Sequence, residues 1–563
     1  MGGSDLQAVL EEVERLLAAA ELSERVELAI QKLLNVVEAL SADKKSLADE
    51  VERLREKLQQ KKKAKTTADG SVDDQEGNQE SKSDHSSEKR RKGDKAKPKS
   101  SHDRRSFKDL KIHETIECPV DPAILPPDAV RLDDESVIVQ DIEIRPKNTK
   151  FQRQVFYSAA QQEYYRGALP AGCDQGDFSA NLRAVIVALK YCGNMSEPKI
   201  GEFLENFDVQ VSAGSISNIL TNSSAQFEQE YHDVLVAGLS STPYQQTDDT
   251  SARVNGEFWH THILCNPFYT LYSTRPRKDR LAVLEVLQNT TELQFRLDPE
   301  TLQLLVAEFS IPEKWQRTIR EAGAVELPAT EFKTLLDDWF GERNAQLRTA
   351  IEQAAAIVAY RRQSSVPIVG TLVCDDAGQF KLLTDKLALC WIHAGRHYEK
   401  LSPVIGRHAE ALEAFREAFW SYYGSLQDYR AGPTEELATQ LRLEFDKLFS
   451  TRTGYEALDN RIAKTQSKRD ELLRVLSEPL VPLHNNASEL GARVSARRRD
   501  VSLHSRSQRG ARAMDVFTTI VQTSKKLGLS AYEYLRDRLS GARDLPSLAQ
   551  TIHQAAQSPV ASG

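Results

Sequence analysis

The chain has 563 residues, of which 40% are hydrophobic and 28% are charged, and its formal net charge is −8. It is too long for a single hydrophobic core, and no apolar stretch approaches the roughly 18–20 residues that span a bilayer. Its six scattered cysteines do not resemble a disulfide framework. We therefore expect a cytoplasmic protein of several domains without a membrane partner. The acidic net charge gives no global sign of nucleic-acid binding, although a local basic face would still attract phosphate.

Residues 1–60 carry apolar side chains that average about 3.5 residues apart, the period of a coiled coil. This pattern predicts a coiled coil that joins copies of the chain. The alternative is a helical hairpin that folds back on itself where the repeat changes phase. The apolar positions are Leu6, Leu10, Val13, Leu17 and Ala20, then Val26, Ile30, Leu33, Val37 and Leu40, then Leu47, Val51, Leu54 and Leu58.

Two segments with little helical character follow. Residues 61–106 have almost no large apolar side chain and cannot bury enough surface to offset the entropy of ordering, so a disordered linker is predicted. Residues 107–180 contain short apolar runs such as "ESVIVQDIEI" between prolines, which predicts a small strand-containing module.

Residues 181–235 have the pattern of a helix-turn-helix. We predict one helix to about Tyr191, a second over Pro198–Phe207 and a third from Ser215, joined by a tight polar turn. The third helix would enter a major groove, with Lys199 and Ser215 as DNA contacts. An ordinary three-helix packing unit is the alternative, because such spacing is common in helical bundles.

Paired acids end two of the predicted strands in the next region. A strand ends at Asp248 and Asp249, two aromatic and β-branched strands and a helix follow, and the later strand "VPIVGTLVCDD" ends at Asp375 and Asp376. Two acidic tips on one sheet can converge, and their carboxylates repel unless a cation lies between them. Mg²⁺ favours such oxygen ligands. The alternative for the second pair is a turn, which Asp tolerates.

A third acid, Glu489, lies in "LVPLHNNASELGARVSARRRD". Asn486 three residues earlier also fits a capping box, so a purely structural role is the alternative. A run of arginines follows, and so many cations repel one another unless they are solvated or face phosphate. The run comprises Arg493, Arg497, Arg498, Arg499, Arg506, Arg509 and Arg512.

From about Gln152 to Leu539, ordered motifs resemble those of the insertion sequence sixty-six transposases. The motifs are "TDDTSARV", "YSTR", "LVCDDAGQF", "LCWIHAGRHYEKL", "NNASELGARV" and "GLSAYEYLRDRL". The resemblance implies an α/β ribonuclease-H-like catalytic core over residues 236–520, with a helical insertion at about 289–365, and a C-terminal helical tail over 521–563. Its implied activity is metal-dependent DNA cleavage and strand transfer by a DDE triad, in the bacterial cytosol near the nucleoid.

Carried over by position, the resemblance assigns Asp248, Asp375 and Glu489 as catalytic acids that hold two Mg²⁺ ions, with Mn²⁺ as a substitute. Asp376 is the alternative to Asp375. The resemblance also implies structural or phosphate-contacting roles for Cys390 and His393. The predicted nucleic-acid contacts on the core are Arg396, Arg493, Arg497, Arg498 and Arg499.

The implied partners are the DNA of the transposon ends and of the target, a second copy of the chain, and helper proteins of the element. Two other functions stay open at this level. One is an inactive or repurposed relative that only binds DNA, because the cysteine-rich finger usual in the family lacks its cysteine pairs here. The other is a coiled-coil scaffold without a DNA role, which would explain residues 1–60 but not the acids.

Overall fold

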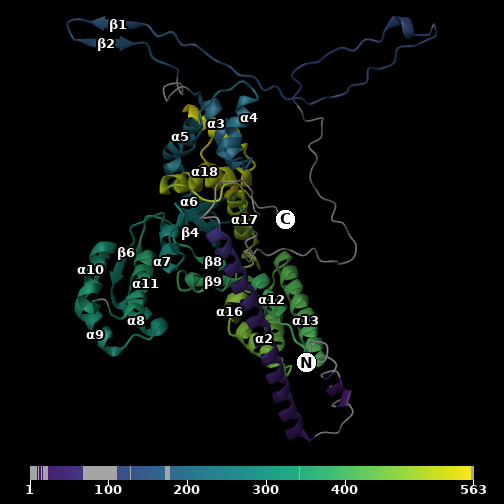
Figure 1. The fold of residues 1–563 in the computed structure, drawn as a ribbon, viewed down its shortest axis with the longest axis vertical. Coiled ribbons are helices and arrows are strands. Elements are labelled where there is room, and N and C mark those ends of the chain that lie inside the picture. Colours follow the sequence, from purple (N-terminus) through teal and green to yellow (C-terminus); the bar gives the residue numbers. More distant parts are fainter. Residues whose placement is uncertain are drawn as a thin grey trace. The chain divides into compact units, whose positions relative to one another are not determined.

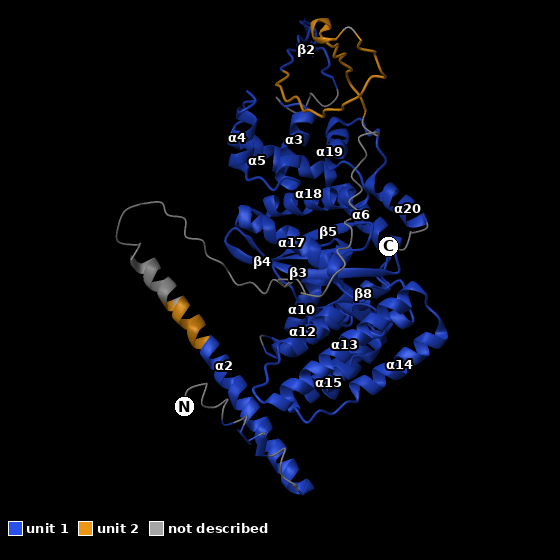
Figure 2. Cartoon of the chain, turned by 90° about the vertical axis from the view of Figure 1, so that its right-hand side faces the viewer, with its two compact units in different colours: residues 1–49, 148–563 blue, residues 50–147 orange. Residues whose placement is uncertain are grey.

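The computed structural model describes residues 23–66, 111–126, 128–170, 178–341 and 343–558, with five isolated positions between Val9 and Leu16. Contacts divide the chain into two compact units, residues 1–49 with 148–563 and residues 50–147 (Figure 2). Four of the five positions of the first apolar repeat (Leu6, Leu10, Leu17 and Ala20) and most of the predicted linker lie outside the described residues. No helix in the described part of the chain combines the length and apolar character needed to cross a bilayer.

A five-stranded mixed sheet in the order β5-β4-β3-β8-β9 forms the centre of the larger unit (Figure 1). Its first three strands make the antiparallel meander that the aromatic and β-branched runs predict. β8 pairs in parallel with β3 and β9 in parallel with β8, so each needs a crossover connection, which contains helices between β3 and β8 and only a short 3-10 turn (Gly378–Phe380) between β8 and β9. The strands are β3 (Tyr244–Val254), β4 (Glu257–Cys265), β5 (Thr270–Arg275), β8 (Thr371–Cys374) and β9 (Lys386–Leu389).

Helix α18 (Gln508–Lys526) closes the free edge of this sheet at β5. Its side chains at four-residue spacing accept hydrogen bonds from alternate backbone amides of the strand. Asp515 accepts from the amide of Thr274 at 2.7 Å. The hydroxyls of Thr519 and Thr523 accept from the amides of Tyr272 and Thr270 at 3.0 and 3.3 Å. The edge amides therefore have partners without a sixth strand.

The predicted helical insertion is only partly helical. It holds helices α8 (Pro299–Phe309), α9 (Glu313–Ala322), α10 (Ala329–Phe340) and α11 (Ala345–Arg362). It also holds a two-stranded antiparallel sheet of β6 (Gln294–Leu297) and β7 (Val325–Pro328), which the sequence did not predict because each strand has only four residues. The helix before the predicted insertion is α7 (Arg280–Gln288).

A cluster of helices after β9 packs around Trp391. Its ring is fully buried, and its Nε1–H donates to the carbonyl of Leu472 at 2.9 Å. Rings of Phe419 and Phe445 lie 5.4 and 6.2 Å from it. The helices are α12 (Trp391–Glu399), α13 (Gly406–Ala431), α14 (Glu435–Phe449), α15 (Glu456–Gln466) and α16 (Arg469–Leu472).

The long N-terminal helix α2 (Glu24–Thr66) docks its first turns on this cluster. Glu38 accepts from the amides of Val404 and Ile405, each at 3.0 Å, where α13 begins. Part of the predicted coiled-coil stripe packs here too, since Ile30 and Val37 lie against Ile405. Other positions of the stripe stay exposed and remain available to a second helix, so the coiled coil stays a prediction. Exposed are Val26, Leu33, Leu40, Leu47, Val51, Leu54 and Leu58.

The region predicted as helix-turn-helix contains three helices. They are α3 (Ala180–Tyr191), α4 (Glu197–Glu205) and α5 (Ala213–Asn222), followed by α6 (Glu228–Ser241). Helix α5 carries no lysine or arginine. Lys199 on α4 pairs with Glu202 at 2.6 Å, and the Ser215 hydroxyl lies 2.9 Å from that of Ser212. DNA binding by these helices stays a prediction.

The predicted C-terminal helical tail contains α19 (Ala531–Ser540) and α20 (Leu548–Gln557).

The strand expected in "ESVIVQDIEI" is absent, and residues 135–144 form no regular structure. Alternating apolar residues make a strand only when another strand and a covering layer meet them, and Val139 is 84% exposed. The strands described between residues 111 and 170 are instead β1 (Val155–Ser158) and β2 (Glu163–Arg166), which form an antiparallel hairpin. The predicted domain boundaries otherwise stay predictions.

Candidate active site

Parallel pairing of β3 with β8 brings two of the predicted acids together. Gln246 lies opposite Val373 in the register, and two residues further along each chain are Asp248 and Asp375. Adjacent strands lie about 4.8 Å apart, and residues at matching positions of a parallel pair share a face. Asp375 directly follows β8, as the strand-tip pattern predicts. The predicted strand end at Asp248 and Asp249 is wrong, because β3 continues past both acids to Val254 in its pairing with β4. Both carboxylates nevertheless belong to one region of the sheet.

Asp248 is held in a site that disfavours its charge. Burial, followed by the negative charges of Asp249, Asp375 and Glu489, raises the pKa of Asp248 to about 7. A hydrogen bond of 2.8 Å from the amide of Asp249 opposes the rise but does not cancel it. All three predicted acids are thus close enough to interact electrostatically.

Glu489 projects from the first turn of α17 (Asn486–Val501). This helix lies directly on the sheet, because a Cβ on Gly491 would come within 2.8 Å of Ile263 Cγ2, and Ile263 pairs with Asp248. Asn485 fixes the start of the helix by donating to the carbonyl of Thr247 at 2.7 Å. No side-chain cap hydrogen bond forms at this helix start, so the capping-box alternative is wrong.

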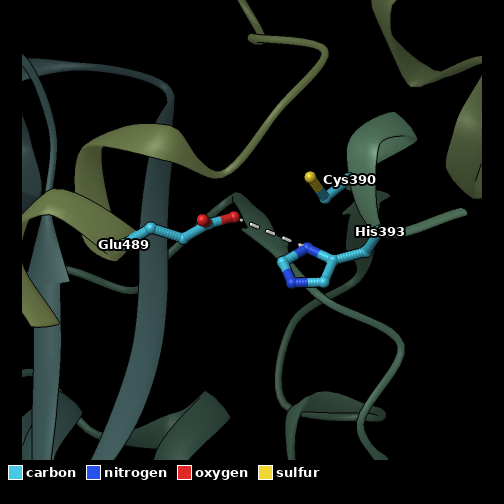
Figure 3. Close-up of side chains that lie close together, drawn as sticks. All are labelled: Cys390, His393 and Glu489. Atoms are coloured by element: carbon cyan, nitrogen blue, oxygen red, sulfur yellow. Dashed lines mark ion pairs between the residues drawn. The ribbon is translucent and has the colours of Figure 1, made fainter. Parts of the chain in front are cut away.

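The carboxylate of Glu489 faces α12 rather than the two aspartates. Its Oε2 lies 3.4 Å from Arg396 Nη2. Its Oε1 lies 3.8 Å from His393 Nδ1, the contact dashed in Figure 3. Among the described residues, the group whose potential ligand atoms all lie within 4.8 Å of one another is Cys390, His393 and Glu489. The three predicted catalytic acids Asp248, Asp375 and Glu489 are therefore less closely clustered than the side chains of Cys390, His393 and Glu489.

Asp375 and Asp376 differ in their contacts. Asp376 forms an ion pair with Lys468 and a second one with Lys381 at 3.3 Å. Asp375 accepts a hydrogen bond of 3.0 Å from the amide of Ala377 and has no ion pair with another described residue. Lysine charge thus already neutralises Asp376, while the charge of Asp375 is left for another cation.

Two of the predicted phosphate-contacting arginines donate hydrogen bonds within the protein; the burial of Arg498 contradicts a DNA contact, whereas the role of the half-buried Arg499 stays a prediction. Arg498 is only 8% exposed, its Nη2 donates to the carbonyl of Tyr191 at 3.0 Å, and Nη1 donates to Thr518. Arg499 donates to Thr250 Oγ1 at 3.1 Å and to the carbonyl of Ser251. These donors are satisfied by the fold.

Other arginines of the run remain open to solvent. Arg497 is exposed and Arg493 is half-buried, and neither forms an ion pair with a described residue. Arg512, in contrast, already forms an ion pair with Glu228 at 2.5 Å. Phosphate contact by Arg493 and Arg497 stays a prediction.

A basic cavity beside Cys390 and His393 was not predicted. Arg461 and Lys464 of α15 and the following Lys468 line it, together with Asp376 and His397. Arg461 and Lys464 have no ion pair within the described residues, and burial and then the charge of Arg461 lower the pKa of His397. Arg461 and Lys464 lie three residues apart on one face of α15, and Lys468 follows just after the helix ends at Gln466.

The five-stranded mixed α/β fold with its helices is compatible with a ribonuclease-H-like transposase domain. The sequence model of the Transposase IS66 family matches residues 345–513, which include Asp375 and Glu489. The chain is also similar to the Uncharacterized protein y4jO of Sinorhizobium fredii (strain NBRC 101917 / NGR234). The two are 34% identical over 309 residues, which is 54% of this chain and 94% of that protein. The chain belongs to the IS66 transposase family, so the resemblance drawn from its motifs is confirmed.

Proposed function

We propose that the protein is a DDE transposase that cleaves DNA and joins the ends to a target, with Asp248, Asp375 and Glu489 as its catalytic acids. The observation that carries this proposal is the parallel register that sets Asp248 beside Asp375, with Glu489 near enough to raise the Asp248 pKa. Membership of the family supports a transposase role and implies DNA binding.

The donor set fits divalent cations with hard oxygen preferences. Three carboxylates share one region, and Asp248 has a pKa raised to about 7 by burial and then by its acidic neighbours. A cation between these groups would remove the repulsion that raises it. When bound, two Mg²⁺ ions would polarise the phosphodiester and neutralise the charge that develops during in-line displacement.

The chain's own residues would position the DNA, and positioning accounts for much of the rate in phosphoryl transfer. Asp248 stands on β3 and Asp375 directly follows the adjacent strand β8, so the sheet fixes the backbone near both acids. Glu489 would join them by turning away from Arg396, which would then face the phosphate. The basic cavity lined by Arg461, Lys464 and Lys468 would hold the neighbouring backbone of the DNA.

Self-association through α2 would let two protomers hold both ends of the element. Leu40, which is 63% exposed, and the other uncovered apolar positions of α2 support this part of the proposal. Leucines at seven-residue spacing on one exposed helix face are typical of a coiled-coil seam.

The proposal is tested by strand transfer with the full chain, using the DNA that flanks its coding region as the donor ends. With Mg²⁺ we expect cleavage at the ends and joining to a target duplex, both lost with EDTA and restored by Mg²⁺ in excess. DNA binding should survive the chelator. Stable binding of the ends without cleavage under any Mg²⁺ or Mn²⁺ condition would contradict the catalytic proposal.

A second prediction separates the paired acids of β8. Asp375→Asn should lower the cleavage rate by about 1,000-fold, because a metal ligand is lost. Asp376→Asn should change the rate by less than about tenfold and cost only about 0.5–1 kcal/mol of stability, the worth of partly exposed ion pairs with Lys381 and Lys468. Initial cleavage rates and chemical unfolding of both variants check this, and the opposite ranking would move the metal role to Asp376.

A further inference from the structure

Cys390 and His393 present two soft or borderline donors on one face of α12, and Glu489 meets them from α17 (Figure 3). Cys390 is the N-cap of α12, and His393 lies one turn later on the same face. The three potential ligand atoms lie within 4.8 Å of one another. This group mixes sulfur, nitrogen and oxygen, unlike the all-carboxylate set proposed above for Mg²⁺.

We propose that Cys390, His393 and Glu489 form a second cation site that selects a thiophilic divalent ion such as Zn²⁺ over Mg²⁺. Zn²⁺ is bound by Cys, His and carboxylate side chains, and sites with three protein ligands leave a fourth position for water or substrate. Mg²⁺ gains little from sulfur or imidazole. The present separations exceed those of a closed zinc site, and a change of rotamer in His393 or Glu489 would shorten them.

The surroundings of Cys390 are suited to a thiolate ligand. The amide of Asn485 donates to its sulfur at 3.3 Å, and the amides of Ile392 and His393, at the start of α12, also favour the charged form of the thiol. Burial raises the pKa of the Cys390 thiol, and these amides oppose the rise. Donors around a ligand atom fix its orientation. Binding would release the thiol proton to solvent and leave the sulfur stabilised by the same amides.

His393 offers an unused ring nitrogen. Its Nδ1 is buried, has no hydrogen-bond partner and faces Glu489 at 3.8 Å. Its Nε2 lies 3.0 Å from Arg396 Nη1. Ligation through Nδ1 would put the ring proton on Nε2, so Arg396 would have to turn away from the ring, and its side chain is partly exposed.

Arg396 already brings a positive charge to the site, since it contacts both His393 and Glu489. It is therefore a competitor for any ion that binds there. A hard ion would gain only charge attraction against this repulsion, whereas a thiophilic ion would also gain a bond to sulfur. The cavity lined by Cys390, His393 and Lys468 gives the ion a way in.

The proposed site shares Glu489 with the catalytic acids. An ion bound to Cys390 and His393 would hold Glu489 away from Asp248 and Asp375, so Zn²⁺ would antagonise Mg²⁺-dependent cleavage. This consequence rests on the proposed transposase activity, whereas the binding site itself does not.

Binding is tested by titrating the full chain with Co²⁺, whose thiolate charge-transfer band reports a metal–sulfur bond. We expect one Co²⁺ per chain with this band, displaced by an equal amount of Zn²⁺, whereas Mg²⁺ should weaken Co²⁺ binding only in large excess, because the two ions share Glu489 alone. Cys390→Ser should abolish the band, and serine keeps an acceptor at the N-cap. Cys265→Ser is the matched control, because Cys265 is 0% exposed and Cys390 2% exposed, and only Cys390 belongs to the group. Thermal melting confirms that both variants fold.

Two more variants sharpen the result. His393→Ala should weaken Co²⁺ binding at least tenfold, and Arg396→Gln should tighten it severalfold by removing the competing cation. An unchanged band in Cys390→Ser, or no band in the folded wild type, would overturn the site. In the cleavage assay Zn²⁺ should inhibit the wild type more strongly than Cys390→Ser. A chain that never cleaves DNA would still give a clear answer in the Co²⁺ titration.

Discussion

Replacing Asp248 with asparagine is expected to abolish Mg²⁺-dependent cleavage, with a loss of at least about 1,000-fold, while binding of the end DNA persists. Asparagine keeps the shape of the side chain but removes the charge that would hold a metal between β3 and β8. Cleavage rates and gel shifts on the same end duplex measure the two effects. Asp249→Asn is the matched control, because Asp249 points to the other face of β3 and accepts from Gln379 at 2.9 Å. Undiminished cleavage by the Asp248 variant would refute its role.

The same variant should be more stable than the wild type when divalent ions are chelated. Burial and then neighbouring acids raise the folded-state pKa of Asp248 to about 7, whereas an unfolded Asp titrates near about 3.9. Between these values the folded state binds more protons, so stability falls as pH rises and the penalty is complete above pH 7. Asp248→Asn should therefore gain on the order of 2 kcal/mol at pH 8 and almost nothing near pH 4.

Chemical unfolding of both proteins in EDTA, at several pH values, measures this difference. Added Mg²⁺ should narrow it by stabilising only the wild type. If the difference in unfolding free energy did not depend on pH, burial and the neighbouring acids would not be raising the pKa of Asp248.

Gly491→Ala is expected to damage both stability and cleavage. Its Cβ would lie 2.8 Å from Ile263 Cγ2 and 3.4 Å from the hydroxyl oxygen of Tyr272, so α17 must move away from β4. Overpacking of this kind costs about 1–3 kcal/mol. Because Glu489 lies two residues earlier on the same helix, a shift of about 1 Å would lower the rate by about 100-fold. Unfolding in denaturant and single-turnover cleavage measure the two losses.

Gly424→Ala supplies the matched control, because this helical glycine has no atom within 4 Å of an added Cβ. Alanine should be neutral there or stabilise by up to about 1 kcal/mol. Ile263→Ala removes the obstructing methyl group, so the double variant with Gly491→Ala should recover part of the lost rate. If Gly491→Ala behaved like Gly424→Ala, close packing of α17 on the sheet would not be what positions Glu489.

Part of the sheet was predictable from local pattern. Alternating aromatic and β-branched residues define β4 and β5, and Asp375 directly follows the apolar run of β8. The acids Asp248 and Asp249 did not mark the end of β3, because that strand continues to Val254 in its pairing with β4. The same logic failed for residues 135–144, because alternation describes a strand only when a neighbouring strand accepts its hydrogen bonds. The four-residue strands β6 and β7 were missed for the opposite reason, since too few residues carry a pattern.

The roles of charged residues were less predictable, because they depend on contacts between distant segments. Arg498 and Arg493 look equivalent in the sequence, yet Arg498 is buried and donates hydrogen bonds to the carbonyl of Tyr191 and the hydroxyl of Thr518. Asn486 and Glu489 fit a capping box, but the helix begins at Asn486 and Asn485 bonds to β3 instead. The sequence shows the spacing of Arg461, Lys464 and Lys468, but only the fold shows that these side chains line a cavity together with His393.

The closure of β5 by α18 has a consequence for how the chain is made. Thr274 and Asp515 are 241 positions apart, so a growing polypeptide completes β5 long before its acceptors leave the ribosome. Until then the amides of Thr270, Tyr272 and Thr274 have no partner from α18 and can pair with a strand of another chain, as the amides of exposed edge strands do. Synthesis of α18 therefore covers this edge of the sheet, and nascent chains that stop before α18 leave the edge amides open to misassembly.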